Sequence, residues 1–344
     1  MEYGAIDLHT KHSQIRIVTA DGRVVVERRI ATQADQFAGV FGGRDRMRIL
    51  LESSTESEWV ATGLEGLGHE VIVADPTFAA MYRSRTRRIK TDRRDVAALA
   101  EANRTGVYRP AYRVSPAQRA IRQRLLVRDQ LVRMRTQLIN LLRSQVRATG
   151  QRMATGRAES FSRRFAALEW PAPMREALRP LAELLEGLAV SLREAEAWAR
   201  QAAAADPVTR RLMTAPGVGP VTALSYRATL DHVERFPDAG RATAYLGLVP
   251  RENSSAERRH RGAITKAGPG RPRALLVQAS WHIWRTGRGG AVALHAWVHR
   301  VAARRGRRIA LVALARRLAR CLYAMWRDGR DFDGTRVRLI AAAA

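Results

Sequence analysis

The sequence has one cysteine, three lysines and no long apolar run. The shortage of cysteine excludes disulfide-stabilised and cysteine-ligated zinc proteins, and the lack of apolar runs excludes membrane-spanning ones. A single cysteine, Cys321, can form neither an internal disulfide nor a cysteine-based zinc site. Because Leu318, Leu322 and Tyr323 surround it in the sequence, we expect it to be a small buried side chain. No apolar run reaches the roughly 18 residues that span a bilayer, and the N-terminus lacks a signal-peptide core. We therefore expect a cytoplasmic protein without a membrane partner.

Acidic side chains are also scarce, with 32 against 60 basic ones and a net charge of +28. Residues 1–76 carry 12 acidic and 8 basic side chains, residues 77–205 carry 11 and 26, and residues 206–344 carry 9 and 26. An acidic first region followed by two strongly basic ones is typical of a protein that binds nucleic acid. Because 57 of the 60 basic residues are arginines, a bias that GC-rich coding produces, the inference depends on net charge and not on any single arginine.

The alternation of apolar residues predicts an α/β domain at the N-terminus. At 344 residues, the chain is long enough for two domains with separate cores. The expected elements are strands at 2–9, 13–19 and 23–30, a helix near 32–42, a strand ending at Glu52, a helix near 57–67 and a strand at 70–74. Three antiparallel strands followed by helix, strand, helix and strand are the order of an RNase H-like domain.

Four acidic residues lie at positions where they could form one site. Asp7 and Glu52 are embedded in apolar strands, where a carboxylate is costly unless something pairs with it. Asp92 and Asp95 open a helical run, and their spacing places both on one face. Three or four carboxylates suit Mg²⁺, and two such ions about 4 Å apart can promote phosphodiester cleavage. We predict catalytic metal ligands at all four positions and no organic cofactor, although Asp92 after Thr91 also resembles a helix cap.

The middle of the chain is predicted to be helical. Ser115-Pro116 is a favourable helix start, and two apolar stripes follow it, separated by a polar break around 150–165. The stripes are formed by Ile121, Leu125, Val132, Leu138, Leu142 and Val146, and by Leu181, Leu185, Leu188, Leu192 and Ala195. They predict an antiparallel helical hairpin or coiled coil, which serves either as an ordinary helical subdomain or as a surface that pairs subunits.

The last third of the chain contains a glycine-rich turn and two amphipathic helices. Gly217 and Gly219 lie in a segment similar to a helix-hairpin-helix turn, in which backbone amides approach a phosphate, although a plain Gly-Pro turn gives the same string. Helices are expected near 291–303 and 307–327. In the second helix, the pattern directs Leu311, Leu314, Leu318 and Leu322 inward and Arg316, Arg317 and Arg320 outward, either to solvent or to a phosphate backbone.

A polar loop after residue 250 carries paired serines among arginines. Ser254 and Ser255 alone would be ordinary turn residues, but Arg258, Arg259 and Arg261 follow them. Arginines could hold a phosphate while a hydroxyl attacks it, provided that a base or a metal activates the hydroxyl. The carboxylates of the first domain could supply that activation.

Together these motifs resemble the IS110 family of insertion-sequence transposases, which are related to Piv-type DNA invertases. Asp7, Glu52, Asp92 and Asp95 match the DEDD set of its RuvC-like domain. The segments from Pro216 to Pro250, the serine pair, and the runs at 262–268 and 273–276 match its second domain. The resemblance implies magnesium at the acids, a serine that attacks DNA, and a structured guide (bridge) RNA that pairs with donor and target DNA. Members read Ser-Gly where this chain reads Ser255-Ala256, which favours Ser255 over Ser254.

We therefore expect three domains: a RuvC-like catalytic domain at 1–110, a helical coiled-coil connector at 111–205, and a mainly α-helical, serine-bearing domain at 206–344. The expected function is that of an RNA-guided DNA transposase or recombinase that acts as a homo-oligomer, a dimer or a tetramer. Beyond Ser255 and the four acids, the expected nucleic-acid contacts are Arg258, Arg259, Arg261, Lys266, Gly217 and Gly219. Two alternatives remain: a RuvC-like nuclease that hydrolyses branched DNA, and a catalytically inactive nucleic-acid-binding protein.

Overall fold

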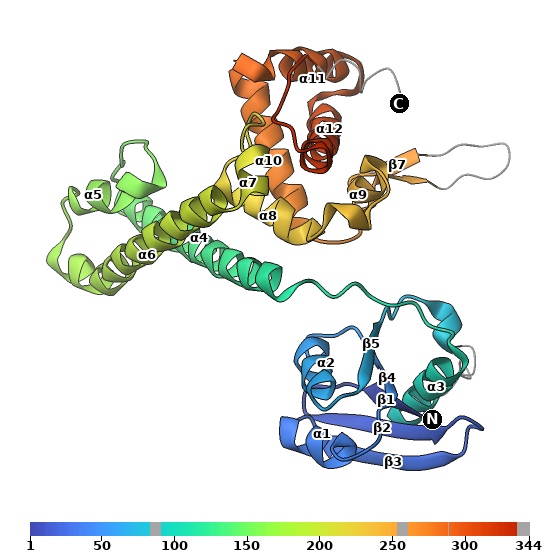
Figure 1. Cartoon of the computed structure of the whole chain (residues 1–344). Helices are drawn as coiled ribbons and strands as arrows, with labels where there is room; N and C mark the ends of the chain where they lie inside the picture. Colours follow the sequence, from blue (N-terminus) through green and yellow to red (C-terminus); the bar gives the residue numbers. More distant parts are fainter. Residues whose placement is uncertain (83–90, 253–260, 288, 336–344) are drawn as a thin grey trace. The chain divides into compact units, whose positions relative to one another are not determined.

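The chain forms two compact units, Met1–Val114 and Ser115–Ala344, in a computed structural model (Figure 1). The structure describes residues 1–82, 91–252, 261–287 and 289–335. Each unit encloses apolar clusters of its own. Among the described residues, none of the helices combines the length and the apolar character needed to cross a membrane.

The first unit is built on a five-stranded mixed sheet. Its strands are β1 (Glu2–Asp7), β2 (His12–Thr19), β3 (Val24–Ala31), β4 (Arg48–Glu52) and β5 (Glu70–Ala74). They lie in the order β3-β2-β1-β4-β5, in which β1, β2 and β3 are antiparallel neighbours and β1, β4 and β5 run parallel. The sequence of elements predicted from the alternation of apolar residues is confirmed.

Helices cover both faces of this sheet. They are α1 (Ala34–Phe41), α2 (Ser57–Gly66), the short 3₁₀ helix η1 (Ala79–Tyr82) and α3 (Asp92–Thr105). Alternate residues of β1 and β4 enter different cores: Ile6 and Leu51 pack in the cluster that contains residues of α1 and α2, whereas Ala5 packs in the cluster that contains residues of α3. Each of these three side chains is fully buried.

One buried asparagine fixes α3 to the centre of the sheet. The side-chain amide of Asn103 donates to the carbonyl oxygens of Gly4 (2.7 Å) and Arg48 (2.8 Å), and its oxygen accepts from the Arg48 Nε (2.8 Å). Because Asn103 is completely buried, these bonds satisfy polar groups that water cannot reach. They join the C-terminal half of α3 to β1 and β4 and so determine where the start of the helix lies.

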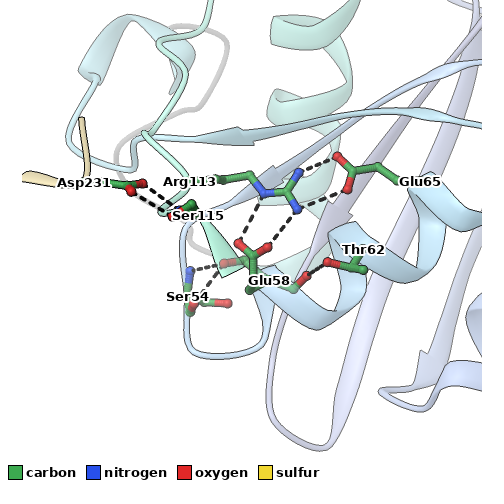
Figure 2. A network of polar contacts seen from close by, with 8 residues as sticks. Ser54, Glu58, Thr62, Glu65, Arg113, Ser115 and Asp231 are labelled. Atoms are coloured by element: carbon green, nitrogen blue, oxygen red, sulfur yellow. Dashed lines mark hydrogen bonds and ion pairs between the residues drawn. The ribbon is translucent and has the colours of Figure 1, made fainter. Parts of the chain in front are cut away.

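The chain leaves the first unit along the open edge of β5, where an arginine holds it. The amide of Ala111 donates to the Val73 carbonyl oxygen at 2.8 Å. Figure 2 shows the guanidinium of Arg113 between the carboxylates of Glu58 and Glu65 on α2, with N–O distances of 2.9 and 3.2 Å to Glu58. The two acids raise the pKa of Arg113 above its usual value. This clamp fastens the exit segment to α2.

The second unit begins with a long helical hairpin. It comprises α4 (Pro116–Ala148), the 3₁₀ turn η2 (Ala158–Ser160), α5 (Phe161–Ala166) and α6 (Ala172–Ala205) (Figure 1). Near the hairpin turn, Leu142 and Val146 of α4 pack with Leu185 of α6 around Phe161 and Trp170. The apolar stripes predicted for this region therefore lie between the two helices.

The base of the hairpin is fastened to α8 (Pro220–Leu230). Ser115 caps α4, and the fully buried carboxylate of Asp231 accepts from its amide at 2.7 Å and its hydroxyl at 2.8 Å (Figure 2). Arg122 of α4 donates to the carbonyl oxygens of Ala228 and Thr229 at the end of α8. These bonds satisfy polar groups at two helix ends at once.

A helical bundle completes the second unit. Besides α8, it contains α7 (Pro207–Leu212), η3 (Val233–Arg235), α9 (Ala239–Tyr245), α10 (Gly270–Thr286), η4 (Gly289–Ala291), α11 (Val292–Arg305) and α12 (Arg307–Asp328). A small antiparallel pair, β6 (Pro250–Glu252) and β7 (Arg261–Ile264), follows α9. The buried hydroxyls of Tyr226 and Tyr323 donate to the carbonyl oxygens of Ala319 and Phe236, at 2.8 and 2.6 Å.

Helix α12 lies at the centre of this bundle, in contact with α7, α9, α10 and α11. The four leucines predicted to face inward are buried, and so is Cys321, whose pKa burial raises to about 11. The predicted outward direction is wrong for Arg317, which is only 8% exposed, whereas Arg316 and Arg320 are half-buried. The spacing of apolar residues identified the apolar face of α12 correctly. Other helices of the bundle also pack against the face that carries the arginines.

The Arg113 clamp leads to a stability prediction. Replacing Arg113 by methionine should lower the free energy of unfolding of the first unit by about 2 kcal/mol, because charged hydrogen bonds are lost and two carboxylates are left facing each other. The matched control is Arg109→Met, which breaks the more exposed pair with Asp75 and should cost about 1 kcal/mol or less. Urea unfolding followed by circular dichroism measures both, and equal losses would contradict the proposed role of the clamp.

Candidate active site

The carboxylates of Asp7 and Glu52 come together at one end of the sheet. Asp7 is the last residue of β1 and Glu52 the last of β4. These strands are parallel neighbours in which Ile6 lies opposite Leu51, so the two acids follow at the same edge. Asp7 is buried and Glu52 is half-buried.

The start of α3 supplies the other two acids. Asp92 is the first residue of the helix and is exposed, whereas Asp95, three positions later, is 7% exposed. The N-cap is Thr91, whose hydroxyl accepts from the Arg94 amide, and the interpretation of Asp92 as the cap is therefore wrong. The partial positive charge of a helix start favours carboxylates at this point.

His9 joins this group, although no sequence motif pointed to it. Its Nε2 lies 3.4 Å from the Asp7 Oδ2 and 3.6 Å from the Asp92 Oδ1. A residue two positions beyond the end of a strand often projects to the same side as the strand's last side chain, and this spacing was the available signal. An isolated histidine after an apolar strand did not by itself indicate a site.

Glu52 has a second neighbour that was not predicted. The Tyr82 hydroxyl, at the end of η1, donates to the Glu52 Oε1. A hydrogen bond from a phenol limits the rotation of a carboxylate. Tyr82 therefore holds Glu52 in place at the edge of the sheet.

Burial and the neighbouring charges shift the pKa of Asp7. Burial is the largest influence on Asp7 and raises the pKa of its carboxyl; the neighbouring His9 lowers it, and Glu52, Asp95 and Asp92 raise it further. Like charges in a partly buried group resist ionisation unless a cation compensates them. The apo site is therefore electrostatically unfavourable at neutral pH.

The donor set suits a divalent cation. Ligand atoms of Asp7, His9 and Asp92 all lie within 4.8 Å of one another, which makes this the one group of three or more such residues found among the described residues. Glu52 and Asp95 add carboxylates close enough to influence Asp7. Hard oxygen donors grouped in this way are the ligands that Mg²⁺ and similar ions prefer, and imidazole is common at transition-metal sites.

The glycine-rich turn lies between α7 and α8. Gly217 has a φ of +76°, and a Cβ there would come within 2.8 Å of the Ala279 carbonyl oxygen on α10, so only glycine fits. Gly219 is the N-cap residue of α8. An open cavity of about 570 Å³ beside this turn is also lined by Gln278 and His282 of α10. Their contact with nucleic acid stays a prediction.

Most of the serine loop lies outside the described residues, including Ser254, Ser255, Arg258 and Arg259. Arg261 opens β7, which pairs with β6. Lys266 is exposed and has a φ of +55°, and its amide donates to the Gly247 carbonyl oxygen at 3.2 Å. The Thr265 amide likewise donates to the Val249 carbonyl oxygen at 2.9 Å, so the two sides of the loop are joined at its base.

Comparisons with known proteins match both the region that carries the four acids and the region that carries the glycine-rich turn and the serine loop. The model of the IS116/IS110/IS902 transposase family matches residues 209–294, and that of the IS110 DEDD transposase domain matches residues 5–150. Over 294 residues the chain is 30% identical to a putative transposase of Sinorhizobium fredii (y4pF/y4sB), covering 83% of this chain and 74% of the relative. The chain belongs to the IS110/IS116/IS902 transposase family. It is a DNA transposase of the insertion-sequence type, as the resemblance in its motifs predicted.

Two further relatives support this assignment along most of the transposase chain. A probable family 20 transposase of Pseudomonas aeruginosa is 29% identical over 333 residues, which are 93% of this chain and 95% of the relative. The transposase for insertion sequence element IS1111A of Coxiella burnetii is 27% identical over 310 residues, 88% of this chain and 84% of the relative. The match to the DEDD domain includes all four acids and favours the use of a divalent metal.

The raised pKa of Asp7 predicts how stability depends on pH. A carboxyl whose pKa is higher in the folded than in the unfolded protein destabilises the fold when it is ionised, and this cost disappears as the pH falls through the folded pKa. Asp7→Asn should therefore be more stable than the metal-free wild type at neutral pH. The difference should shrink on acidification and vanish below the ordinary value of 3.8.

Urea unfolding in a chelator, repeated across a pH series, measures this difference. Asp21→Asn is the matched control, because a hydrogen bond from Thr19 lowers the pKa of Asp21, so its loss should cost stability at neutral pH. In the same Asp7→Asn protein, Mg²⁺ or Mn²⁺ binding by calorimetry should weaken by about 100-fold or more, since even changes beyond the ligands cost about 10–100-fold. Wild-type metal affinity in Asp7→Asn would refute the metal site.

Proposed function

We propose that the first unit is an RNase H-like, RuvC-like domain that carries out Mg²⁺-dependent phosphodiester chemistry on DNA. The observation that carries the proposal is the convergence of Asp7, Glu52, Asp92 and Asp95 at the ends of β1 and β4 and the start of α3, in a member of a transposase family. The strand order β3-β2-β1-β4-β5 also supports it.

Each side chain of the site has a distinct part in this proposal. Asp7 and Glu52 are fixed by adjacent strands and would hold Mg²⁺ together with Asp92 and Asp95. When bound, divalent ions stabilise charge on a phosphate under attack and help to activate the nucleophile. Tyr82 orients Glu52 through its hydroxyl. His9 lies between Asp7 and Asp92 and partly offsets their charge in the metal-free protein.

Ser255 is our candidate nucleophile for strand transfer. Its Oγ would form a bond to a DNA phosphorus while the bond from that phosphorus to one deoxyribose oxygen breaks. The hydroxyl proton leaves the serine, and a proton joins the released oxygen. A later attack by a DNA hydroxyl on the phosphoserine would reverse these changes and rejoin the strand. Arg258, Arg259 and Arg261 would hold the phosphate by charged hydrogen bonds.

The partners in the proposal are donor DNA, target DNA and a structured guide RNA. Phosphate contacts by an arginine-rich chain supply affinity but little sequence information, so base pairing with an RNA would select the sites. The acids and the serine belong to different compact units. We therefore also propose three functional regions, at 1–110, 111–205 and 206–344, and a homo-oligomer in which the regions cooperate. Gly217, Gly219 and Lys266 remain candidate contacts to nucleic acid.

The serine step is tested by trapping the covalent intermediate. Ser255→Ala should reduce the protein–DNA adduct seen in denaturing electrophoresis by at least about 1000-fold, the scale of loss seen when nucleophiles are removed. Ser254→Ala is the matched control and should retain the adduct. Loss of the adduct in Ser254→Ala, but not in Ser255→Ala, would identify Ser254 as the nucleophile. DNA cleavage by the wild type without any adduct would favour the metal-dependent nuclease.

The proposed role of RNA makes a separate prediction. Purified protein should bind many nucleic acids, with an affinity that falls about a thousandfold or more between about 50 and 200 mM salt. Recombination at a defined site should require the cognate RNA, and light scattering should show more than one subunit in the complex. Site-selective recombination by RNA-free protein, or a strict monomer with DNA and RNA bound, would contradict the proposal.

A further inference from the structure

The turn that joins α7 to α8 leaves backbone amides without acceptors. The first hydrogen bond of α8 runs from the Ala223 amide to the Gly219 carbonyl oxygen at 2.9 Å, so the amides of Val221 and Thr222 have no acceptor within the helix. Gly219 is the N-cap residue and has no side chain that could accept from them. The aligned peptide dipoles of this 11-residue helix also give its start a partial positive charge. The turn therefore offers hydrogen-bond donors to an anion.

A buried hydroxyl beside these amides also lacks a partner. Thr222 is only 9% exposed, and among the described residues nothing forms a hydrogen bond with its hydroxyl. Thr222 lines the open cavity of about 570 Å³ beside the turn, where a group from solvent can reach it. A polar group that has lost water without gaining a partner costs free energy, and a ligand that accepts from it removes that cost. The hydroxyl is thus a second, independent indication of a ligand.

Helix α10 supplies donors from another side of the same cavity. The cavity is lined by four residues on one face of this helix, Leu275, Gln278, Ala279 and His282. The backbone of this face touches the turn, since a Cβ at Gly217 would lie 2.8 Å from the Ala279 carbonyl oxygen (Figure 1). Gln278 and His282 are exposed, and a glutamine amide and a histidine ring each carry N–H donors.

The lining of the cavity suits an anion. No aspartate or glutamate is among the described residues that line it. Gly219 also lines it, and a Cβ at this position would meet no atom within 4 Å, so the packing of the described residues does not require glycine there. A position without a side chain lets a ligand approach the backbone closely. Amide donors at a helix start and a bare backbone are the combination that binds phosphate oxygens.

We propose that the turn and α10 bind a backbone phosphate of DNA in this cavity. The amides of Val221 and Thr222 and the Thr222 hydroxyl would donate to its oxygens, and Gln278 and His282 would hold the same strand from α10. The family match at 209–294 includes the whole cavity, and a transposase acts on DNA. The inference rests on the proposed contact of the glycine-rich turn with nucleic acid. It is independent of the magnesium site, the serine step and the guide RNA.

Thr222→Val tests the proposal, because valine keeps the shape of threonine and removes only the hydroxyl. Binding of the full-length protein to a short labelled duplex DNA is measured by fluorescence anisotropy in a chelator, which prevents metal-dependent cleavage. The affinity should fall about tenfold, the loss expected for a hydrogen bond to a charged group. Since no positive charge is removed, the slope of log affinity against log salt should stay that of the wild type. The melting temperature should not fall, because the hydroxyl has no partner to lose in the free protein.

Thr229→Val is the matched control. Thr229 lies on the same helix and is 4% exposed, but it does not line the cavity, so its replacement should leave the affinity unchanged. Gln278→Glu is the second variant, in which an exposed carboxylate would repel the phosphate and weaken binding about tenfold or more. Its control is Gln201→Glu, which adds the same charge at an exposed position of α6 and should change the affinity much less.

Three outcomes would overturn the proposal. The first is wild-type DNA affinity in both Thr222→Val and Gln278→Glu. The second is weaker binding of an RNA duplex of the same sequence with unchanged DNA binding, which would assign the cavity to RNA. The third is loss of inorganic phosphate binding, measured by calorimetry, with unchanged DNA binding, which would indicate a site for a free anion. Failure of the proposed function would look different, as lost metal binding, a missing covalent adduct or no DNA binding by the wild type.

Discussion

The parallel pairing of β1 with β4 is the contact on which the catalytic site depends. It brings the last residues of two strands, Asp7 and Glu52, to one edge of the sheet, although 45 positions separate them in the sequence. The bonds from Asn103 to the backbone of both strands then place the start of α3, and with it Asp92 and Asp95, beside them. Together, these contacts keep four carboxylates close to one another although their negative charges repel.

Some charged groups of this transposase are neutralised by neighbours of opposite charge, whereas others lie beside like charges. At Arg113, one guanidinium meets two carboxylates, and the compensated group fastens the chain to α2. At Asp7, like charges gather instead in a partly buried group, and the neighbouring carboxylates raise the pKa of Asp7. Uncompensated groups of this kind cost stability in the free protein and become favourable when a ligand of opposite charge binds. The group of carboxylates at Asp7 suits a divalent cation.

Much of the fold could be predicted because its signals are local. The strands of the first unit alternate apolar and polar residues, and Ser115-Pro116 marks the start of α4 where the structure has it. Two errors or omissions share another cause. His9 was missed and Arg317 was directed outward, because their neighbours come from distant segments. Asp92 was taken as a cap because Thr91, the actual cap, is an equally good one.

The sequence by itself determined the order of strands and helices in the first unit, the family and the basic character of the C-terminal two thirds, because periodicity, residue type and net charge do not depend on distant contacts. Only the tertiary structure decided that His9 lies between Asp7 and Asp92, that Tyr82 binds Glu52, and that Arg317 is buried against Trp297. Periodicity gives the direction of a side chain from its own helix or strand, whereas burial depends on what packs against it, and those residues are far away in the chain.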